Sequence, residues 1–146
     1  MLAFANYRAG FAALRMAEER VRRVNSASFE PKPPAVALDV GQIFRHRKHG
    51  FRGVVVEWFE TCPGDDEWFE TYGPFERGRE QPFYRTLVDT KDRPHPFVAL
   101  AAEENLEPLD GEALPVDHPL MDQCFSDFDG GRHTLSDDWA QKYPDN

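Results

Sequence analysis

The side chains that could bind a metal or take part in catalysis are spread along this chain, and their spacing does not form a recognisable metal or catalytic motif. His46 and His49 stand three apart in a predicted hairpin, which places the two imidazoles on opposite faces and makes a poor metal pair. Asp65, Asp66 and Glu67 lack the Gly and terminal Glu spacing of a calcium loop and are expected to be solvated surface. Neither a phosphate-binding glycine loop nor a nucleophile with a base is recognisable. The sequence therefore predicts a protein that is not an enzyme, with no metal and no cofactor.

A short basic stretch is the first candidate binding surface. It contains the concentrated positive patch Arg45, His46, Arg47, Lys48, His49 and Arg52. Such a patch can neutralise DNA phosphates, with Phe51 and Tyr84 beside it to lie against sugars or bases. A plain solvated hairpin is the equally weighted alternative. Opposing DNA binding, the chain has a net charge of −9, and from residue 103 onward twelve acidic residues face only Arg132 and Lys142. We therefore expect DNA binding to be weak at physiological salt.

An aromatic loop over residues 57–75 is the second candidate surface. Within it the segment Trp58-Phe59-Glu60-Thr61 is echoed by Trp68-Phe69-Glu70-Thr71. Aromatic side chains outside regular strands and flanked by charge are candidates for interface hot spots. Trp58, at a strand end, is expected to cap the core, whereas for Trp68 capping and partner contact are both open. The predicted partner-binding residues are Arg45, His46, Arg47, Arg52, Trp68, Phe69, Tyr72, Pro82, Phe83 and Tyr84.

Short β-branched and aromatic runs predict the elements that would position these surfaces. Residues 40–44 and 54–59 form a hairpin with Gly50 and Gly53 at its turn and bend. The run 54–56, three valines, fits a strand buried on both faces. Residues 83–88, beginning after Pro82, and residues 97–100 give two further strands. The expected core is a compact, mostly antiparallel β unit, in which Gly41, Gly50, Gly53 and Asn105 maintain the fold.

The flanking segments have different characters. Apolar residues at alternating spacings of three and four predict one amphipathic helix of about twenty residues, which Asn25-Ser26 can end. This helix either packs on the barrel or on a preceding domain, or it docks a partner or a second copy of the chain. Three prolines in residues 31–34 favour a stiff spacer. The two cysteines, Cys62 and Cys124, are expected to be free thiols in a reducing environment.

The central segments together resemble the YccV-like family, which includes the bacterial protein HspQ, described as a hemimethylated-DNA-binding protein and as a modulator of protein degradation. The matching positions are Gly41, Arg45-His46, Gly50, Gly53-Val54-Val55-Val56, Pro82-Phe83-Tyr84, Leu87-Val88, Ala101 and Asn105-Leu106. The stretch from Asp117 to Pro144 is similar to the extension that follows this domain in eukaryotic F-box proteins. The plant Clp-protease adaptor ClpF is a further relative, although its usual helical UVR-type motif is not recognisable here.

The resemblance implies a mainly β fold: a small SH3-like antiparallel β-barrel with an N-terminal amphipathic helix and an acidic, mostly irregular C-terminal extension. The predicted division is an N-terminal helix (1–29), a Pro-rich linker (30–38), a YccV-like β-barrel domain (39–109) and the extension (110–146). Its relatives lie beside degradation machines, so the implied function is a protein-interaction module linked to regulated proteolysis of the ubiquitin-ligase, Clp or Lon type. The alternative is a hemimethylated-DNA-binding protein that uses the basic hairpin at 45–52.

The expected partner is a protein: a protease, a ubiquitin-ligase subunit or a substrate. DNA is disfavoured by charge, and an oligomer is an open possibility. No apolar run approaches the 18 or so residues of a membrane span, so we expect an intracellular soluble protein, cytoplasmic or nuclear, with an organelle such as the chloroplast as a further option.

Overall fold

The computed structural model describes residues 4–5, 32–109, 111 and 113–143. Its strands are β1 (Phe4–Ala5), β2 (Ile43–His46), β3 (Arg52–Phe59), β4 (Phe83–Val88), β5 (Val98–Ala102), β6 (Leu106–Pro108), β7 (Phe125–Asp129) and β8 (Arg132–Leu135). Its helices are α2 (Asp66–Tyr72), the 3-10 turn η1 (Glu103–Asn105), α3 (Met121–Cys124) and α4 (Asp137–Ala140). Phe4–Ala5, expected inside a helix, form a strand instead, and the rest of that predicted helix lies outside the described residues.

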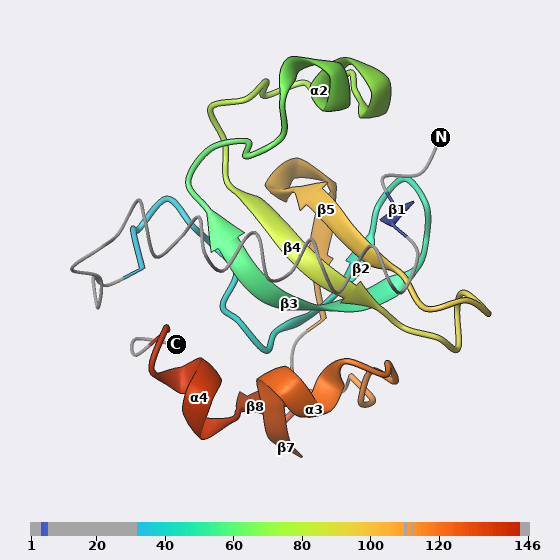
Figure 1. Cartoon of the computed structure of the whole chain (residues 1–146), viewed down its shortest axis with the longest axis vertical. Helices are drawn as coiled ribbons and strands as arrows, with labels where there is room; N and C mark the ends of the chain where they lie inside the picture. Colours follow the sequence, from blue (N-terminus) through green and yellow to red (C-terminus); the bar gives the residue numbers. More distant parts are fainter. Residues whose placement is uncertain (1–3, 6–31, 110, 112, 144–146) are drawn as a thin grey trace.

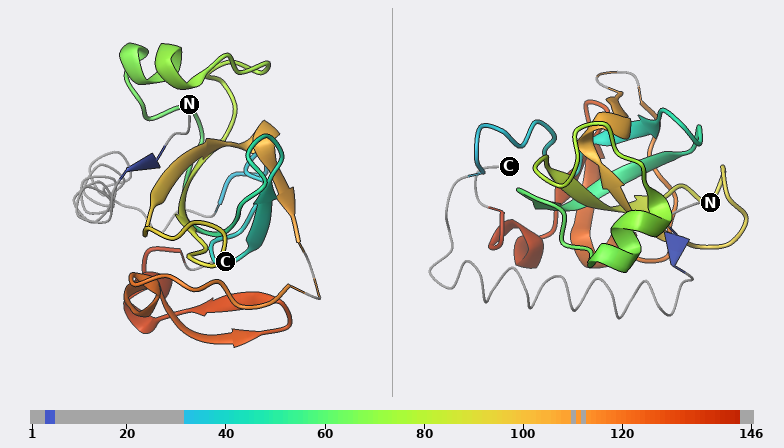
Figure 2. Two further views of the ribbon diagram at one scale, coloured as in Figure 1. Left: turned by 90° about the vertical axis from the view of Figure 1, so that its right-hand side faces the viewer. Right: turned by 90° about the horizontal axis from the view of Figure 1, so that it is seen from above.

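One curved antiparallel sheet carries the fold (Figures 1 and 2). Its strand order is β1-β5-β4-β3-β2-β6, and every pairing in it is antiparallel. The prediction of a mainly antiparallel β fold is therefore confirmed. Within the described part of the chain no pairing joins β1 to β6, so the sheet has two edges and is not a fully closed barrel.

The valine run of β3 lies at the centre of the core. Val54, Val55 and Val56 are each 0 % exposed, although successive side chains of a strand point to opposite faces. Both faces of β3 are thus covered, as the absence of polar alternation predicted. On one side the C-terminal segment lies against the sheet (Figure 1), and the indole Nε1 of Trp139 donates to the carbonyl of Val56 at 2.8 Å.

The C-terminal extension contains more regular structure than the sequence predicted. β7 and β8 form a hairpin, with α3 before it and α4 after it. Gly41 lets this hairpin approach the main sheet: its φ is +94°, and a Cβ there would lie 2.2 Å from the carbonyl oxygen of His133. The amide of His133 donates to the Gly41 carbonyl at 2.9 Å. The local sequence does not predict these helices and strands, because their formation depends on contacts with the main sheet.

The predicted linker contributes to the same core. Val36 and Leu38 are each 2 % exposed, and the amide of Leu38 donates to the hydroxyl of Tyr84 at 3.1 Å. The packed core therefore begins within the segment expected to be a spacer. Within the described ranges, no helix is both long enough and apolar enough to cross a membrane.

Candidate functional site

The basic hairpin forms where it was predicted, with β2 and β3 paired and residues 47–49 in the turn between them. Gly50 follows the turn with φ +74°, a conformation that glycine adopts without steric cost. Arg45, Arg47 and Lys48 are exposed. Arg45 folds back locally, since its Nη1 donates to the carbonyl of Gly50 at 2.8 Å. The turn thus presents a small cluster of cations to solvent.

The two histidines of this hairpin stack on each other, which corrects the prediction that they occupy opposite faces. Their ring centroids are 4.7 Å apart, and Phe51 also stacks on His46 at 4.9 Å. The strand period does not apply because His49 belongs to the turn. His46 Nδ1 accepts from the amides of Lys48 and His49, each at 3.2 Å, so the proton of the neutral ring resides on Nε2. Burial lowers the pKa of His46 to about 4, which keeps this ring neutral near pH 7.

Arg52, predicted as a partner contact, instead fastens the C-terminal segment. Its Nη2 lies 3.3 Å from a carboxylate oxygen of Asp89 and donates to the carbonyl of Leu114 at 2.7 Å. The other Asp89 oxygen accepts from the amide of Asp117 at 3.3 Å. Because Asp89 is 1 % exposed, this guanidinium neutralises a buried charge. Arg52 is therefore committed within the molecule.

The aromatic loop contains a helix that the sequence analysis did not predict. Asp65, expected to be solvated surface, is the N-cap of α2, and its side chain accepts from the amide of Trp68 at 2.8 Å. Asp66 and Glu67 occupy the first turn, where negative charge favours the helix dipole. The acidic run is thus a helix-start signal.

Trp68 and Phe69 are half-buried and pack into a small second core. Trp68 stacks on Phe75 at 5.9 Å, meets Phe83 edge-on at 6.2 Å and lies over Gly64. Phe69 lies 5.0 Å from Phe75. These contacts show that Trp68 packs within the molecule, and its contact with a partner stays a prediction.

The entry to β4 lies in the interior rather than on a binding surface. Pro82 is buried, and Phe83 and Tyr84 are each 0 % exposed. The Tyr84 hydroxyl donates to a Glu103 oxygen at 2.6 Å, and burial together with this bond raises the pKa of Tyr84. These side chains were expected to contact a partner, but β4 is an inner strand, with β3 and β5 on either side.

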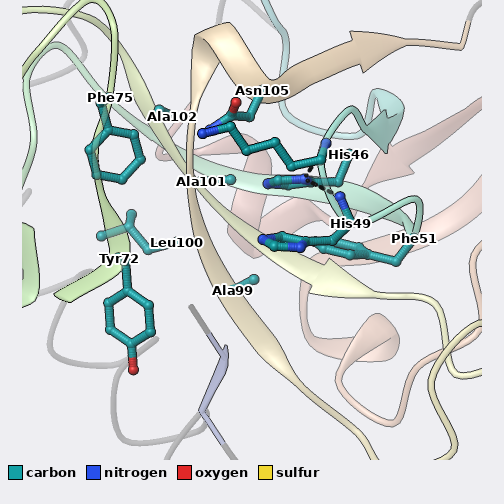
Figure 3. Close-up of a pocket in the computed structure, with 11 residues that line it drawn as sticks. His46, His49, Phe51, Tyr72, Phe75, Ala99, Leu100, Ala101, Ala102 and Asn105 are labelled. Atoms are coloured by element: carbon teal, nitrogen blue, oxygen red, sulfur yellow. Dashed lines mark hydrogen bonds between the residues drawn. The ribbon is translucent and has the colours of Figure 1, made fainter. Parts of the chain in front are cut away.

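A hollow along β5 is the candidate site that the structure adds (Figure 3). One wall is the hairpin turn with the stacked rings of His46 and His49, and the opposite wall carries Tyr72 and Phe75. Its floor is the small-residue strand β5. The complete lining is His46, Lys48, His49, Phe51, Tyr72, Phe75, Ala99, Leu100, Ala101, Ala102 and Asn105. We call this set the β5 hollow.

Only two of the predicted partner-binding residues, His46 and Tyr72, line the β5 hollow. The enclosed volume of about 30 Å³ admits a side-chain tip or a water or two, but not a drug-sized ligand. Among the described residues that line it, Lys48 is the only lysine or arginine, and none carries a carboxylate. The alanines of β5 were not predicted as site residues, because only the tertiary structure brings β5 beside the hairpin turn. Lys48 and His49 were not predicted as partner contacts either, although both belong to the basic patch found in the sequence.

The curved antiparallel sheet and the hollow along β5 define a small β-rich domain. Its sequence gives the family: the chain belongs to the YccV-like family, described as "Hemimethylated DNA-binding protein YccV like", which it matches over residues 36–132.

F-box proteins are among its relatives. The chain is 29% identical to "F-box only protein 21" of Mus musculus over 118 residues, covering 80% of this chain and 18% of that protein. It is 30% identical to "F-box only protein 21" of Homo sapiens over 112 residues, covering 75% of this chain and 17% of that protein. The chain thus spans less than a fifth of the length of these curated relatives.

Proposed function

We propose that this chain is a non-enzymatic adaptor module that binds a protein partner and helps to select or present substrates for regulated proteolysis. The observation that carries the proposal is the β5 hollow, where aromatic and imidazole walls flank strand β5. Half-buried aromatic side chains beside a recess are typical anchors of protein interfaces. The F-box relatives support the link to ubiquitin ligases, since they carry a similar segment.

The distribution of positive charge favours a protein partner over DNA. Of the basic hairpin, Arg52 is bound to Asp89 and His46 is a buried neutral ring, which leaves Arg45, Arg47 and Lys48 exposed. A few exposed cations on a chain with net charge −9 provide little of the phosphate neutralisation on which non-specific DNA affinity depends.

Hemimethylated-DNA binding is the second candidate function. It is favoured by the family description and by the three exposed cations of one hairpin, Arg45, Arg47 and Lys48. In this case Arg45 and Arg47 would contact phosphates, and the affinity would fall steeply with salt.

Two measurements separate the candidates. The first is fluorescence anisotropy of labelled hemimethylated and unmethylated duplexes at about 50 and 150 mM salt. The second is capture of protease or ubiquitin-ligase subunits on the immobilised chain. The adaptor proposal expects specific capture that is weakened by Tyr72→Ala and survives replacement of Arg45 and Arg47 by Glu. A preference for the hemimethylated duplex that persists at the higher salt and is lost on that replacement would overturn it.

A further inference from the structure

One row of side chains crosses the outer face of the main sheet. Glu57 of β3 lies opposite Arg85 of β4, which in turn lies opposite Leu100 of β5. Residues directly opposite each other in antiparallel strands point to the same face. Tyr84, the neighbour of Arg85, points to the inner face, where its hydroxyl accepts from the amide of Leu38. We call Glu57, Arg85 and Leu100 the outer row.

The outer row is buried although two of its side chains are charged. Glu57 is 1 % exposed, Leu100 is 8 % exposed, and the side chain of Arg85 is 12 % exposed. Arg85 Nε and Glu57 Oε1 lie 3.6 Å apart. A buried ion pair of this kind is stable only under a cover that excludes water and supplies further polar contacts. The outer row therefore has the character of an interface.

The described elements that pack on this face lie to either side of the outer row. Phe83, two residues from Arg85 and on the same face, belongs to the small core beside α2. On the other side the C-terminal segment is fastened to Arg52 and to the carbonyl of Phe97. Figure 1 shows α2 and the C-terminal segment at opposite ends of the sheet, and none of the described helices crosses β3 and β4 between them. The cover of the outer row must then come from the rest of the chain.

Residues 6–31, which lie outside the described part, connect the two sides of this face. Ala5, the last residue of β1, lies opposite Val98 at the β5 edge. The described chain resumes at Lys32, which pairs with Asp39, and Asp39 leads into β2 on the far side of β3. Strands about 4.8 Å apart place β1 about 14 Å from β3, whereas a helix of about twenty residues spans about 30 Å. The connecting chain is thus long enough to cross the outer row as a helix.

This connecting chain has the sequence pattern of a helix that buries one side. Its apolar side, with residues spaced by three, four and seven positions, consists of Tyr7, Phe11, Leu14 and Val21. Glu18 falls within that side, and Met16 lies opposite to it. A carboxylate on a buried side needs a counter-charge, and the outer row carries the guanidinium of Arg85. The apolar side and the outer row therefore match in charge as well as in length.

We infer that residues 7–21 form an amphipathic helix that docks within the same chain on the outer row, between α2 and the C-terminal segment. Its apolar side covers Leu100, and Glu18 adds a carboxylate near the guanidinium of Arg85. The N-terminal segment is thereby part of the folded domain and not an arm that reaches for a partner. This placement is independent of the proposed function, because it concerns contacts within one chain.

Site-specific photo-cross-linking of the intact chain is the direct test. The probe p-benzoylphenylalanine replaces Phe11 on the apolar side, or Met16 on the opposite side as the matched control, and mass spectrometry identifies the cross-linked peptides. We expect the probe at Phe11 to label β3, β4 or β5 of its own chain. The probe at Met16 should label them about tenfold less, because opposite sides of a helix are about 10 Å apart. A mixture of isotopically light and heavy chains distinguishes cross-links within one chain from those between two.

Acidic substitutions measure what docking contributes to stability. Leu14→Asp places a charge on the buried side and should lower the Tm of the full chain by about 5 °C or more. Met16→Asp makes the same kind of change on the opposite side and should lower the Tm by less than about 2 °C. Leu14→Asp should also abolish the cross-links from the probe at Phe11.

Several results would overturn the inference. They are cross-links from Phe11 that join two chains, equal labelling from Phe11 and Met16, and a Tm of Leu14→Asp equal to that of the parent chain. An unchanged Tm of Leu14→Asp together with weaker capture of ligase or protease subunits would assign the segment to partner docking instead. Capture that is equal in Leu14→Asp and Met16→Asp, with the expected difference in Tm, supports docking within the chain.

Discussion

Replacing Trp68 by alanine tests whether the aromatic loop is a packed element or an exposed contact. The indole stacks on Phe75, meets Phe83 edge-on and lies over Gly64. Truncating a fully buried tryptophan costs about 3–5 kcal/mol, and because Trp68 is half-buried we expect a loss of about 2 kcal/mol. Trp68→Phe keeps part of the stacking and should lose about 1 kcal/mol or less.

Urea unfolding followed by far-UV circular dichroism is the appropriate assay, because the substitution removes a fluorophore. A loss of about 2 kcal/mol corresponds to a decrease in Tm of roughly 5–10 °C for a domain of this size. An unchanged m-value would show that the unfolding transition itself is preserved. Leu114→Ala is the control, since Leu114 is 66% exposed and should change stability by less than about 0.5 kcal/mol.

The functional consequence of Trp68→Ala follows from the same packing. Trp68 lies 5.3 Å from Tyr72, which lines the β5 hollow, so loss of the indole should loosen that wall and weaken partner capture together with stability. A stability within about 0.5 kcal/mol of the parent chain, combined with lost partner capture, would refute the packing argument and restore direct contact by an exposed Trp68.

Three further outcomes are expected. Gly53→Val should destabilise the fold by more than about 3 kcal/mol in urea unfolding, because a Cβ there already meets Phe44 at 2.7 Å; a loss below about 1 kcal/mol would contradict this. Arg52→Ala should lower the free energy of unfolding by about 3 kcal/mol, because it leaves the buried Asp89 carboxylate without its ion-pair partner. Arg45→Ala should change it by less than about 0.5 kcal/mol. Similar changes in Tm for the two variants would contradict a stabilising role of the Arg52–Asp89 ion pair. Burial lowers the pKa of His133 from 6.5 to about 4, so the stability it contributes is complete above pH 6.5 and is lost as pH falls toward 4, by roughly 3 kcal/mol at most. His133→Gln should flatten the stability profile over that window, and an unaltered slope would exclude the assignment.

Local patterns predicted the elements of this chain well where a single propensity dominates. The valines of β3 and the glycines of the hairpin are consistent with one structure only, a strand pair with a tight turn, and this is what forms. The motif set around them also indicated the YccV-like family, to which the chain belongs. The helix α2 was missed because its N-cap, Asp65, was interpreted as part of a solvated acidic run.

The candidate site was predicted less well because its walls come from segments that are far apart in the sequence. Phe83 and Tyr84 were expected at a surface, but strand pairing on both sides places them inside. Arginine is a residue type that commonly contacts DNA phosphates, but Arg52 forms an ion pair with Asp89, which lies 37 residues further along the chain. Side-chain type identifies which groups can bind, and only the fold determines which of them are already bound.

The sequence by itself determined that this chain is a mainly antiparallel β protein with an acidic C-terminal segment and a basic turn, since alternation, β-branching and charge are local properties. The tertiary structure alone decided that the turn, the end of α2 with Phe75, and strand β5 meet in one hollow. The reason is physical: the hollow depends on sheet register and on contacts between segments far apart in the chain, and neither is encoded in any one segment.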